Sequence, residues 1–263
     1  MTHLRTRLRR AMSVVVDHSP LRWPLSQRVT SHAGRLARLY GLVGLALLLS
    51  LAVFAAGLWG FVRIAESVLE GETAQFDEGV LRWLDAHATP TLDRMAIEIT
   101  ALGSGTVVVV IVLALSALLW QVRQRYLVYL LWLTVSGSVV LNAILKLSFD
   151  RPRPRVFEWR VHYPVSSSFP SGHAMTAAVV YLTVAIIILR VNGARKLGII
   201  ALLCAAILML LVGLSRMYVG VHYPSDVVAG YAAGVAWTGL CTAAIGVLRA
   251  RAERTIATAV QDK

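Results

Sequence analysis

The sequence predicts an all-α protein, a six-transmembrane-helix bundle, from three observations. Of the 263 residues, 57% are hydrophobic and 15% are charged, whereas a soluble domain has about 45–50% apolar and about 25% charged residues. The mean hydropathy is +0.67. Six apolar runs approach the length of about 20 residues that a helix needs to cross the hydrocarbon core. Together these values exclude an ordinary water-soluble enzyme.

The six predicted spans follow one another along the whole chain. By length alone, the second and fourth runs also fit buried core helices. The connections beside them are too short to reverse a chain that failed to cross, so we expect all six to span. An even number of spans places both termini on one side of the membrane. The runs cover residues 39–62, 103–120, 126–147, 173–189, 197–214 and 227–248.

Basic residues assign that side to the cytoplasm, because cytoplasmic segments are enriched in Lys and Arg. Residues 1–38 carry eight arginines and one acid, and segments 121–125, 190–196 and 249–263 add nine basic residues against two acids. Connection 65–102 instead carries eight acids and two arginines. We therefore predict a multi-pass protein of the cell (inner) membrane with both termini cytoplasmic. The net charge of +12 is then mainly a topology signal, and no nucleic-acid partner is expected.

This layout divides the chain into three predicted segments. Residues 1–38 form a basic cytoplasmic N-terminal segment, residues 39–248 the six-span domain, and residues 249–263 a basic cytoplasmic tail. The N-terminal segment either lies along the anionic inner leaflet or forms a disordered basic tail. No cleavable signal peptide is expected, because the first long apolar run begins near residue 39 and is long enough to remain as an anchor.

An amphipathic helix is predicted in the acidic connection between the first two spans. Phe76, Val80, Leu81 and Leu84 recur there at helical spacing, with acids between them. We expect this helix to rest at the outer membrane interface. It acts there either as a guard that controls lipid access or as simple packing of the loop.

Charged residues at the outer ends of the spans form two clusters that the topology does not require. The first begins at Lys146 and includes Arg153, and the second runs from Ser215 to Asp226 and includes Arg216. A guanidinium matches the forked geometry of phosphate oxygens, so Lys146, Arg153 and Arg216 are predicted to bind an anion. The remaining arginines of the region are expected to meet lipid headgroups: Arg151, Arg155 and Arg160.

The segment Pro170-Ser171-Gly172-His173 opens the fourth predicted span. Pro170 fits the first turn of a helix. The free backbone N–H groups that follow, with the positive end of the helix dipole, form an anion site. Gly172 allows close backbone approach, Ser171 adds a hydroxyl donor, and His173 can give a proton near neutral pH.

His222 and Asp226 stand four residues apart, so on a helix the carboxylate can orient the imidazole. Arg216 lies six residues upstream. A nucleophilic histidine beside phosphate-binding cations indicates phosphoryl transfer through a phosphohistidine. The alternative is a three-ligand metal site made of His173, His222 and Asp226. It is disfavoured because three neighbouring cations would repel a divalent metal.

Together these residues resemble the type 2 phosphatidic acid phosphatase superfamily of lipid phosphatases, which also includes soluble acid phosphatases and vanadium haloperoxidases. Its signature reads Lys-x6-Arg-Pro, Pro-Ser-Gly-His and Ser-Arg-x5-His-x3-Asp. The three parts occur at 146–154, 170–173 and 215–226 without departure. The six-span layout extends the likeness to about residues 39–248. The haloperoxidase branch is set aside because its relatives are soluble.

The resemblance implies an active site at the extracytoplasmic membrane interface. It implies that His222 is the nucleophile, that Asp226 orients it, and that His173 is the general acid. It also implies that neither a metal nor another cofactor is needed. The implied phosphate-binding residues are Lys146, Arg153, Ser171, Gly172 and Arg216.

We therefore expect an integral-membrane, metal-independent phosphatase that hydrolyses a lipid phosphomonoester or pyrophosphate, with lipid phosphates and membrane lipids as its partners. Candidate substrates are undecaprenyl pyrophosphate, phosphatidylglycerol phosphate, phosphatidic acid and diacylglycerol pyrophosphate. One alternative is a phosphotransferase that moves a phosphoryl group from a prenyl pyrophosphate to a lipid or sugar acceptor. Another is a lipid-binding protein with a dead site, against which the complete motifs argue. The sequence makes no prediction of oligomeric state.

Overall fold

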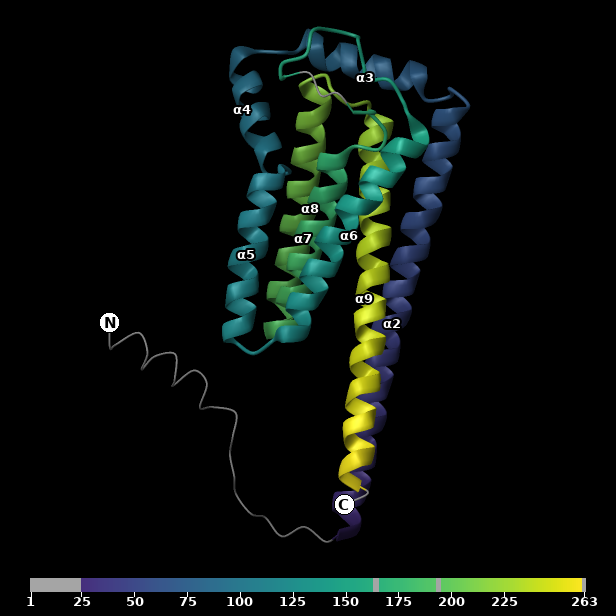
Figure 1. Ribbon diagram of the computed structural model, residues 1–263, viewed down its shortest axis with the longest axis vertical. Coiled ribbons are helices and arrows are strands. Elements are labelled where there is room, and N and C mark those ends of the chain that lie inside the picture. The colour runs from purple at the N-terminus through teal and green to yellow at the C-terminus, as the bar shows by residue number, and fades with distance from the viewer. Residues whose placement is uncertain (1–24, 163–165, 193–194, 262–263) are drawn as a thin grey trace, which may run out of the picture. The chain divides into compact units, whose positions relative to one another are not determined.

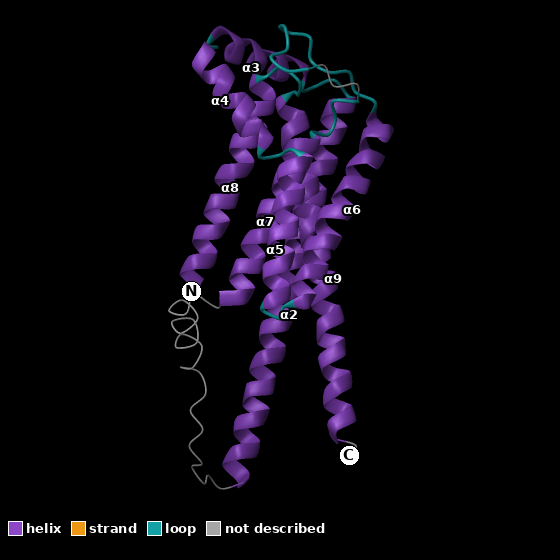
Figure 2. Cartoon of the chain, turned by 60° about the vertical axis from the view of Figure 1, so that its left-hand side comes forward, coloured by secondary structure: helices purple, strands orange, loops and turns teal. Residues whose placement is uncertain are grey.

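The computed structural model describes residues 25–162, 166–192 and 195–261. The chain divides into two units, of which the first ends at Gly44 and the second begins at Leu45. Every regular element in these ranges is a helix (Figure 2), which confirms the all-α prediction. Of the first unit, only the backbone at the start of α2 is described. The expectation that residues 1–38 lie along the inner leaflet or form a disordered tail therefore concerns residues 1–24, which lie outside the described residues, and side chains that are not described. The second unit holds all three motifs.

The helices follow in one sequence along the described chain (Figure 1). Their bounds are α2 Leu25–Leu69, α3 Ala74–Ala86, α4 Pro90–Ala101, α5 Gly105–Gln121, α6 Arg125–Phe149, α7 Gly172–Asn192, α8 Arg195–Tyr218 and α9 Pro224–Gln261.

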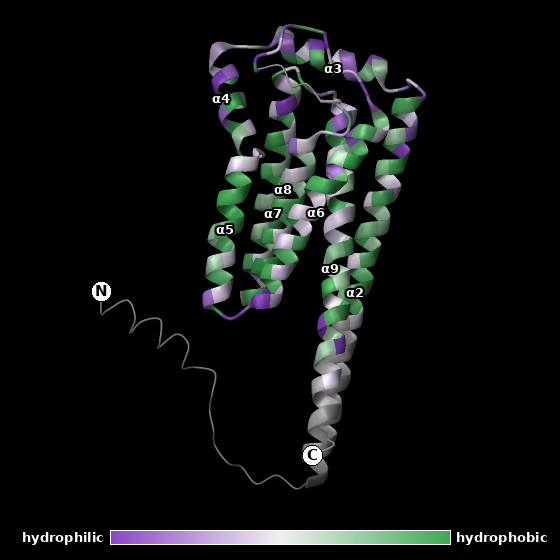
Figure 3. Cartoon of the chain, in the orientation of Figure 1, coloured by the Kyte–Doolittle hydropathy of each residue, from purple (hydrophilic) through white to green (hydrophobic). Residues whose placement is uncertain are grey.

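Six spans are obtained when α4 and α5 are counted as one. Five described helices are long and apolar enough to cross a membrane, and α4 and α5 form a pair bent by 45° at residues 102–104. Figure 3 shows apolar residues along the spans and hydrophilic ones gathered at the end where α3 lies. The predicted second span corresponds to α5, whereas α4 was not predicted, because its mixed composition hides it. Its start is nevertheless marked by Thr89, whose side chain accepts the Leu92 N–H, and by Pro90.

Helix α7 lies at the centre of the bundle and packs against α6, α8 and α9. Its first turns are buried on all sides, at Ala174, Met175, Ala178 and Val179. A helix that is apolar all round belongs inside a protein. The His173 end of α7 is therefore positioned by three neighbouring helices.

Two glycines on α9 bring its backbone against α7. A Cβ at Gly230 would lie 2.6 Å from the Ser171 carbonyl oxygen, and one at Gly234 would lie 2.7 Å from the Ala178 Cβ and 2.8 Å from the Met175 carbonyl oxygen. Spanning helices associate through such close contacts because lipid provides no hydrophobic drive between them. The contact fixes the start of α9 beside the start of α7.

The predicted amphipathic helix is present as α3, which packs over the ends of α8 and α9. Leu81 and Leu84 are buried in a cluster with Tyr218, as the spacing predicts. Phe76 departs from the expected face and is 67% exposed. Its neighbour Asp77 is completely buried instead, because it finds charged and polar partners at the candidate site.

The α7–α9 contact gives a test of stability. Gly234→Ala should lower the free energy of unfolding by about 1–3 kcal/mol, because the added methyl group overlaps α7. Gly246→Ala on the same helix is the matched control, since a Cβ there meets nothing within 4 Å. Thermal melting of the purified protein in detergent measures both. Equal melting midpoints for the two variants would contradict the packing assignment.

Candidate functional site

The three motifs meet at one end of the bundle. Lys146 lies in the last turn of α6 and Arg216 in the last turn of α8, while α7 begins at Gly172 and α9 at Pro224. His173 experiences the charges of Arg216, His222, Arg153 and Lys146. Residues separated by up to 76 positions in sequence (146 to 222) thus share one electrostatic site.

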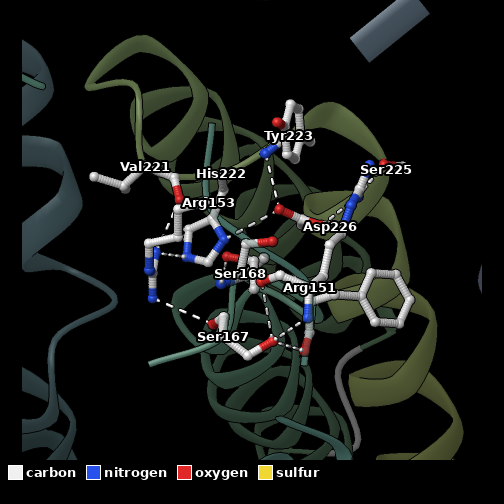
Figure 4. A network of polar contacts seen from close by, with 12 residues as sticks. Arg151, Arg153, Ser167, Ser168, Val221, His222, Tyr223, Ser225 and Asp226 are labelled. Atoms are coloured by element: carbon white, nitrogen blue, oxygen red, sulfur yellow. Dashed lines mark hydrogen bonds and ion pairs between the residues drawn. The ribbon is translucent and has the colours of Figure 1, made fainter. Parts of the chain in front are cut away.

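His222 is buried between a carboxylate and a guanidinium (Figure 4). Its Nδ1 lies 3.5 Å from Asp226 Oδ2 and makes no hydrogen bond with a described residue. Its Nε2 lies 3.3 Å from Arg153 Nη1. Asp226 Oδ2 also accepts the Tyr223 N–H at 2.9 Å. Catalytic hydrogen bonds are often long without substrate, and this arrangement turns Nδ1 toward the acid and Nε2 toward the cation.

The surroundings of His222 keep its ring neutral. Burial lowers the pKa of His222 from 6.5 to about 4, although the nearby Asp226 acts in the opposite direction and raises it. Arg153 and Arg216 add to the lowering. A neutral imidazole has a free lone pair on one ring nitrogen. At neutral pH this lone pair is therefore available on His222 without prior loss of a proton.

Loop carbonyls position two of the predicted phosphate-binding cations. Arg153 donates from Nε to the Ser166 carbonyl oxygen and from Nη1 to the Val221 carbonyl oxygen, both at 2.8 Å. Lys146 donates from Nζ to the Ser167 carbonyl oxygen. The loop before α7 therefore holds both side chains, and Arg153 lies beside His222.

Arg216 is held by the last turn of α4, next to the break between α4 and α5. It is 7% exposed, and its Nη1 donates to Thr100 Oγ1 at 2.9 Å. A Cβ at Gly103, inside the break, would lie 3.3 Å from His173 Cβ. The Arg216 Nε is buried and has no hydrogen-bond partner among the residues that the structure describes. Such a group costs about 1–3 kcal/mol, which a ligand oxygen would offset.

Ser171 and Gly172 shape the start of α7. Ser171 is completely buried, and its Oγ accepts the Ala174 N–H at 3.5 Å as a helix cap. Its own N–H donates to the Asp226 carbonyl oxygen at 2.9 Å. A Cβ at Gly172 would lie 3.0 Å from Asn142 Oδ1. Because the helix begins at Gly172, the placement of Pro170 in the first turn was wrong.

The expectation that Arg151 and Arg160 meet lipid headgroups was also wrong. Arg151 is 15% exposed and forms ion pairs with Asp77 and Asp226. Arg160 is 16% exposed and forms one with Asp85 at 2.5 Å. Connection 65–102 supplies Asp77 and Asp85, and the third motif supplies Asp226. Spacing along the chain does not reveal these pairings. Arg155 is exposed. Sequence reasoning thus missed Arg151, Asp77, Asn142 and Thr100 as residues that contact the site.

The alternative metal site finds no support in the described donors. Within residues 25–162, 166–192 and 195–261, no group of three His, Cys, Asp or Glu side chains is arranged to hold a metal ion. His173, His222 and Asp226, the predicted alternative ligand set, therefore do not form such a group.

Comparison with known proteins identifies the family. The PAP2 superfamily model matches residues 125–249. Phosphatidylglycerophosphatase B of Bacillus subtilis is 30% identical over 179 residues, which cover 66% of this chain and 86% of that protein. The chain belongs to the PAP2 superfamily.

Other PAP2 relatives agree with this assignment. The crystal structure of a transmembrane PAP2-type phosphatidylglycerolphosphate phosphatase from Bacillus subtilis superimposes with a TM-score of 0.67 at 28% identity, covering 72% of this chain and 93% of that one. Lipid A 1-phosphatase of Rhizobium johnstonii is 36% identical over 123 residues, which cover 44% of this chain and 46% of the relative. This PAP2 protein is a multi-pass membrane phosphatase, as its motifs predict.

Titration of the histidines tests the site of this PAP2 protein directly. Because burial lowers the pKa of His222 to about 4, its ring should stay neutral from about pH 8 down to about pH 5 and gain a proton only below that. Nitrogen-15 NMR of the labelled protein in detergent measures this, with the His222 signal assigned by its loss in His222→Ala. A midpoint near the ordinary value of about 6.5 would contradict the buried site.

Proposed function

We propose that this PAP2 protein hydrolyses a lipid phosphate through a phosphohistidine formed on His222. The observation that carries the proposal is the position of that ring. Its neutral Nε2 lies 3.3 Å from the guanidinium of Arg153, while Nδ1 faces Asp226. A phosphate held by Arg153 is thereby placed next to the attacking nitrogen.

In the first step, His222 Nε2 attacks the phosphorus in line with the bond to the lipid oxygen. A P–N bond forms, the P–O bond to the lipid breaks, and His173 gives its proton to the leaving oxygen. Asp226 stabilises the positive charge that develops on the ring. Lys146, Arg153 and Arg216 neutralise charge on the phosphoryl oxygens.

In the second step, a water molecule attacks the phosphohistidine. His173 accepts a proton from that water, a P–O bond forms, and the P–N bond to His222 breaks. Inorganic phosphate leaves, and both histidines return to their starting protonation states. Ser171 and Gly172, at the positive end of α7, add backbone and hydroxyl donors for the phosphate.

The orientation that we propose places this site on the outer face of the membrane. The site lies at the helix ends covered by α3 and α4, which contain most of the acids of connection 65–102. The strongly basic segments are the termini and the turns 121–125 and 190–196. The positive-inside rule assigns those segments to the cytoplasm. Residues 39–248 then form the catalytic domain, flanked by cytoplasmic segments 1–38 and 249–263.

Phosphatidylglycerol phosphate is the first substrate that we propose to test. Its support is the name of the Bacillus subtilis relative, which matches this chain over 86% of its own length. Undecaprenyl pyrophosphate and phosphatidic acid complete the test set, because the predicted contacts are all to the phosphate group that the three lipids share.

Loss of the nucleophile tests the mechanism. His222→Ala should reduce phosphate release from all three lipids by at least about 10³-fold, since the proposed covalent intermediate forms on the ring that this change removes. His162→Ala, which changes an exposed histidine of the same loop region, should retain activity. Phosphate is measured with purified protein in detergent. Retained turnover in His222→Ala would disprove the mechanism, and phosphate transfer seen only with an added alcohol would favour the phosphotransferase.

Metal independence is tested by chelation. Activity on phosphatidylglycerol phosphate should persist after dialysis against EDTA, because protein cations do the charge neutralisation. Activity that disappears with EDTA and returns with a divalent ion would support the metal alternative instead.

A further inference from the structure

A polar network joins helix α3 to the acid beside His222. Figure 4 shows Arg151, Ser225 and Asp226 of this network. The centre of the network is Arg151, in the loop after α6. The Nη1 of Arg151 donates to Asp226 Oδ1 at 2.6 Å and to Ser225 Oγ at 2.8 Å. Its Nη2 donates to Asp77 Oδ2 at 2.9 Å. The Arg151 guanidinium thus pairs with a carboxylate of α3 and a carboxylate of α9, which are far apart in sequence.

Arg151 controls which way Asp226 points. The two Asp226 oxygens have separate tasks: Oδ1 accepts from Arg151, while Oδ2 accepts the Tyr223 N–H and faces His222 Nδ1. The Arg151 guanidinium also stacks on the Tyr223 ring at 4.3 Å. Rotation of the Asp226 carboxylate away from His222 would break its hydrogen bonds with the Arg151 guanidinium and the Tyr223 N–H. The position of Arg151 therefore sets the carboxylate geometry that the imidazole meets.

Asp77 holds Arg151 and the first turn of α9 at the same time. Its Oδ1 accepts the Ser225 N–H at 3.0 Å, and its Oδ2 accepts the Ser225 hydroxyl at 2.5 Å. The first N–H groups of a helix lack partners within it, and a carboxylate there is favourable. Asp77 is 0% exposed. A fully buried carboxylate from α3 is thus built into the start of the helix that carries Asp226.

We propose that Asp77 and Arg151 are positioning residues of the phosphatase. Asp77 fixes Arg151 and the start of α9, and Arg151 fixes Asp226 so that it faces His222. Helix α3 is then part of the active site, although none of the three motifs includes it. The proposal rests on the proposed role of His222 as the nucleophile.

A second ion pair on α3 gives a matched control. Arg160 joins Asp85 on α3 at 2.5 Å and Asp93 on α4 at 3.1 Å, and it donates to the Tyr218 carbonyl oxygen at 2.8 Å. These bonds attach the same helix to the bundle without reaching Asp226. If Asp77 served only to attach α3, loss of either acid would have the same effect on the reaction.

The test compares kcat and KM for phosphatidylglycerol phosphate in the full-length protein in detergent. Asp77→Asn and Arg151→Gln should each lower kcat by roughly 10- to 100-fold with KM unchanged, because orientation is lost while the phosphate-binding cations remain. Asp85→Asn should keep kcat at the wild-type value. Arg151→Lys should recover part of the loss, since it restores the charge.

The double variant Asp77→Asn/Arg151→Gln guards against misfolding, because it removes the buried Asp77 carboxylate together with its Arg151 counterion. It should lose no more kcat than Arg151→Gln alone, since the two residues act in series. Wild-type kcat in Asp77→Asn, an equal loss in Asp85→Asn, or additive losses in the double variant would overturn the positioning role. If His222→Ala is inactive in the same assay, such a result refutes this inference alone. Turnover in His222→Ala would refute the proposed function and, with it, the inference.

Discussion

Two completely buried carboxylates, Asp77 and Asp226, share the guanidinium of Arg151. A buried charge without a partner costs several kcal/mol, so all three groups must be assembled together or not at all. This requirement constrains the end of the bundle that α3 covers. It brings α3, the loop after α6 and the first turn of α9 to one point. The contacts that orient Asp226 beside His222 therefore also attach α3 to this end of the bundle.

Below that network, backbone contacts rather than side chains fix the helices. Gly230 and Gly234 let α9 touch α7, and the Ser171 N–H binds the Asp226 carbonyl oxygen where the two helices begin. Backbone contacts of this kind leave little freedom for sliding or rotation. Because these contacts fix the start of each helix, small polar adjustments are enough to aim the side chains of the site. The bent α4–α5 pair completes the site, since Thr100 binds Arg216 and Gly103 lies against His173.

Much of this arrangement follows from local sequence patterns. Apolar run length predicts the spans, and the position of each motif at a span end brings Lys146, His173 and Arg216 together. The periodicity that predicts α3 also places Leu81 and Leu84 inside, but it assigns Phe76 to the same face and overlooks Asp77. Periodicity describes one helix at a time, whereas the burial of Asp77 depends on a cation 74 positions away. Likewise the cap residues of α4 mark its start, but nothing local reveals that it contacts Arg216.

The location of Asp77 has an evolutionary consequence. The region that matches the PAP2 superfamily covers residues 125–249, so the acid lies outside it while its partner Arg151 lies inside. A lineage that replaces one of these residues leaves the other buried without its counterion, and selection then acts against the intermediate. Positions 77 and 151 are therefore expected to change together among close homologues. At position 77, divergence of α3 is therefore expected to be limited by Arg151, a residue of the region that matches the PAP2 superfamily model.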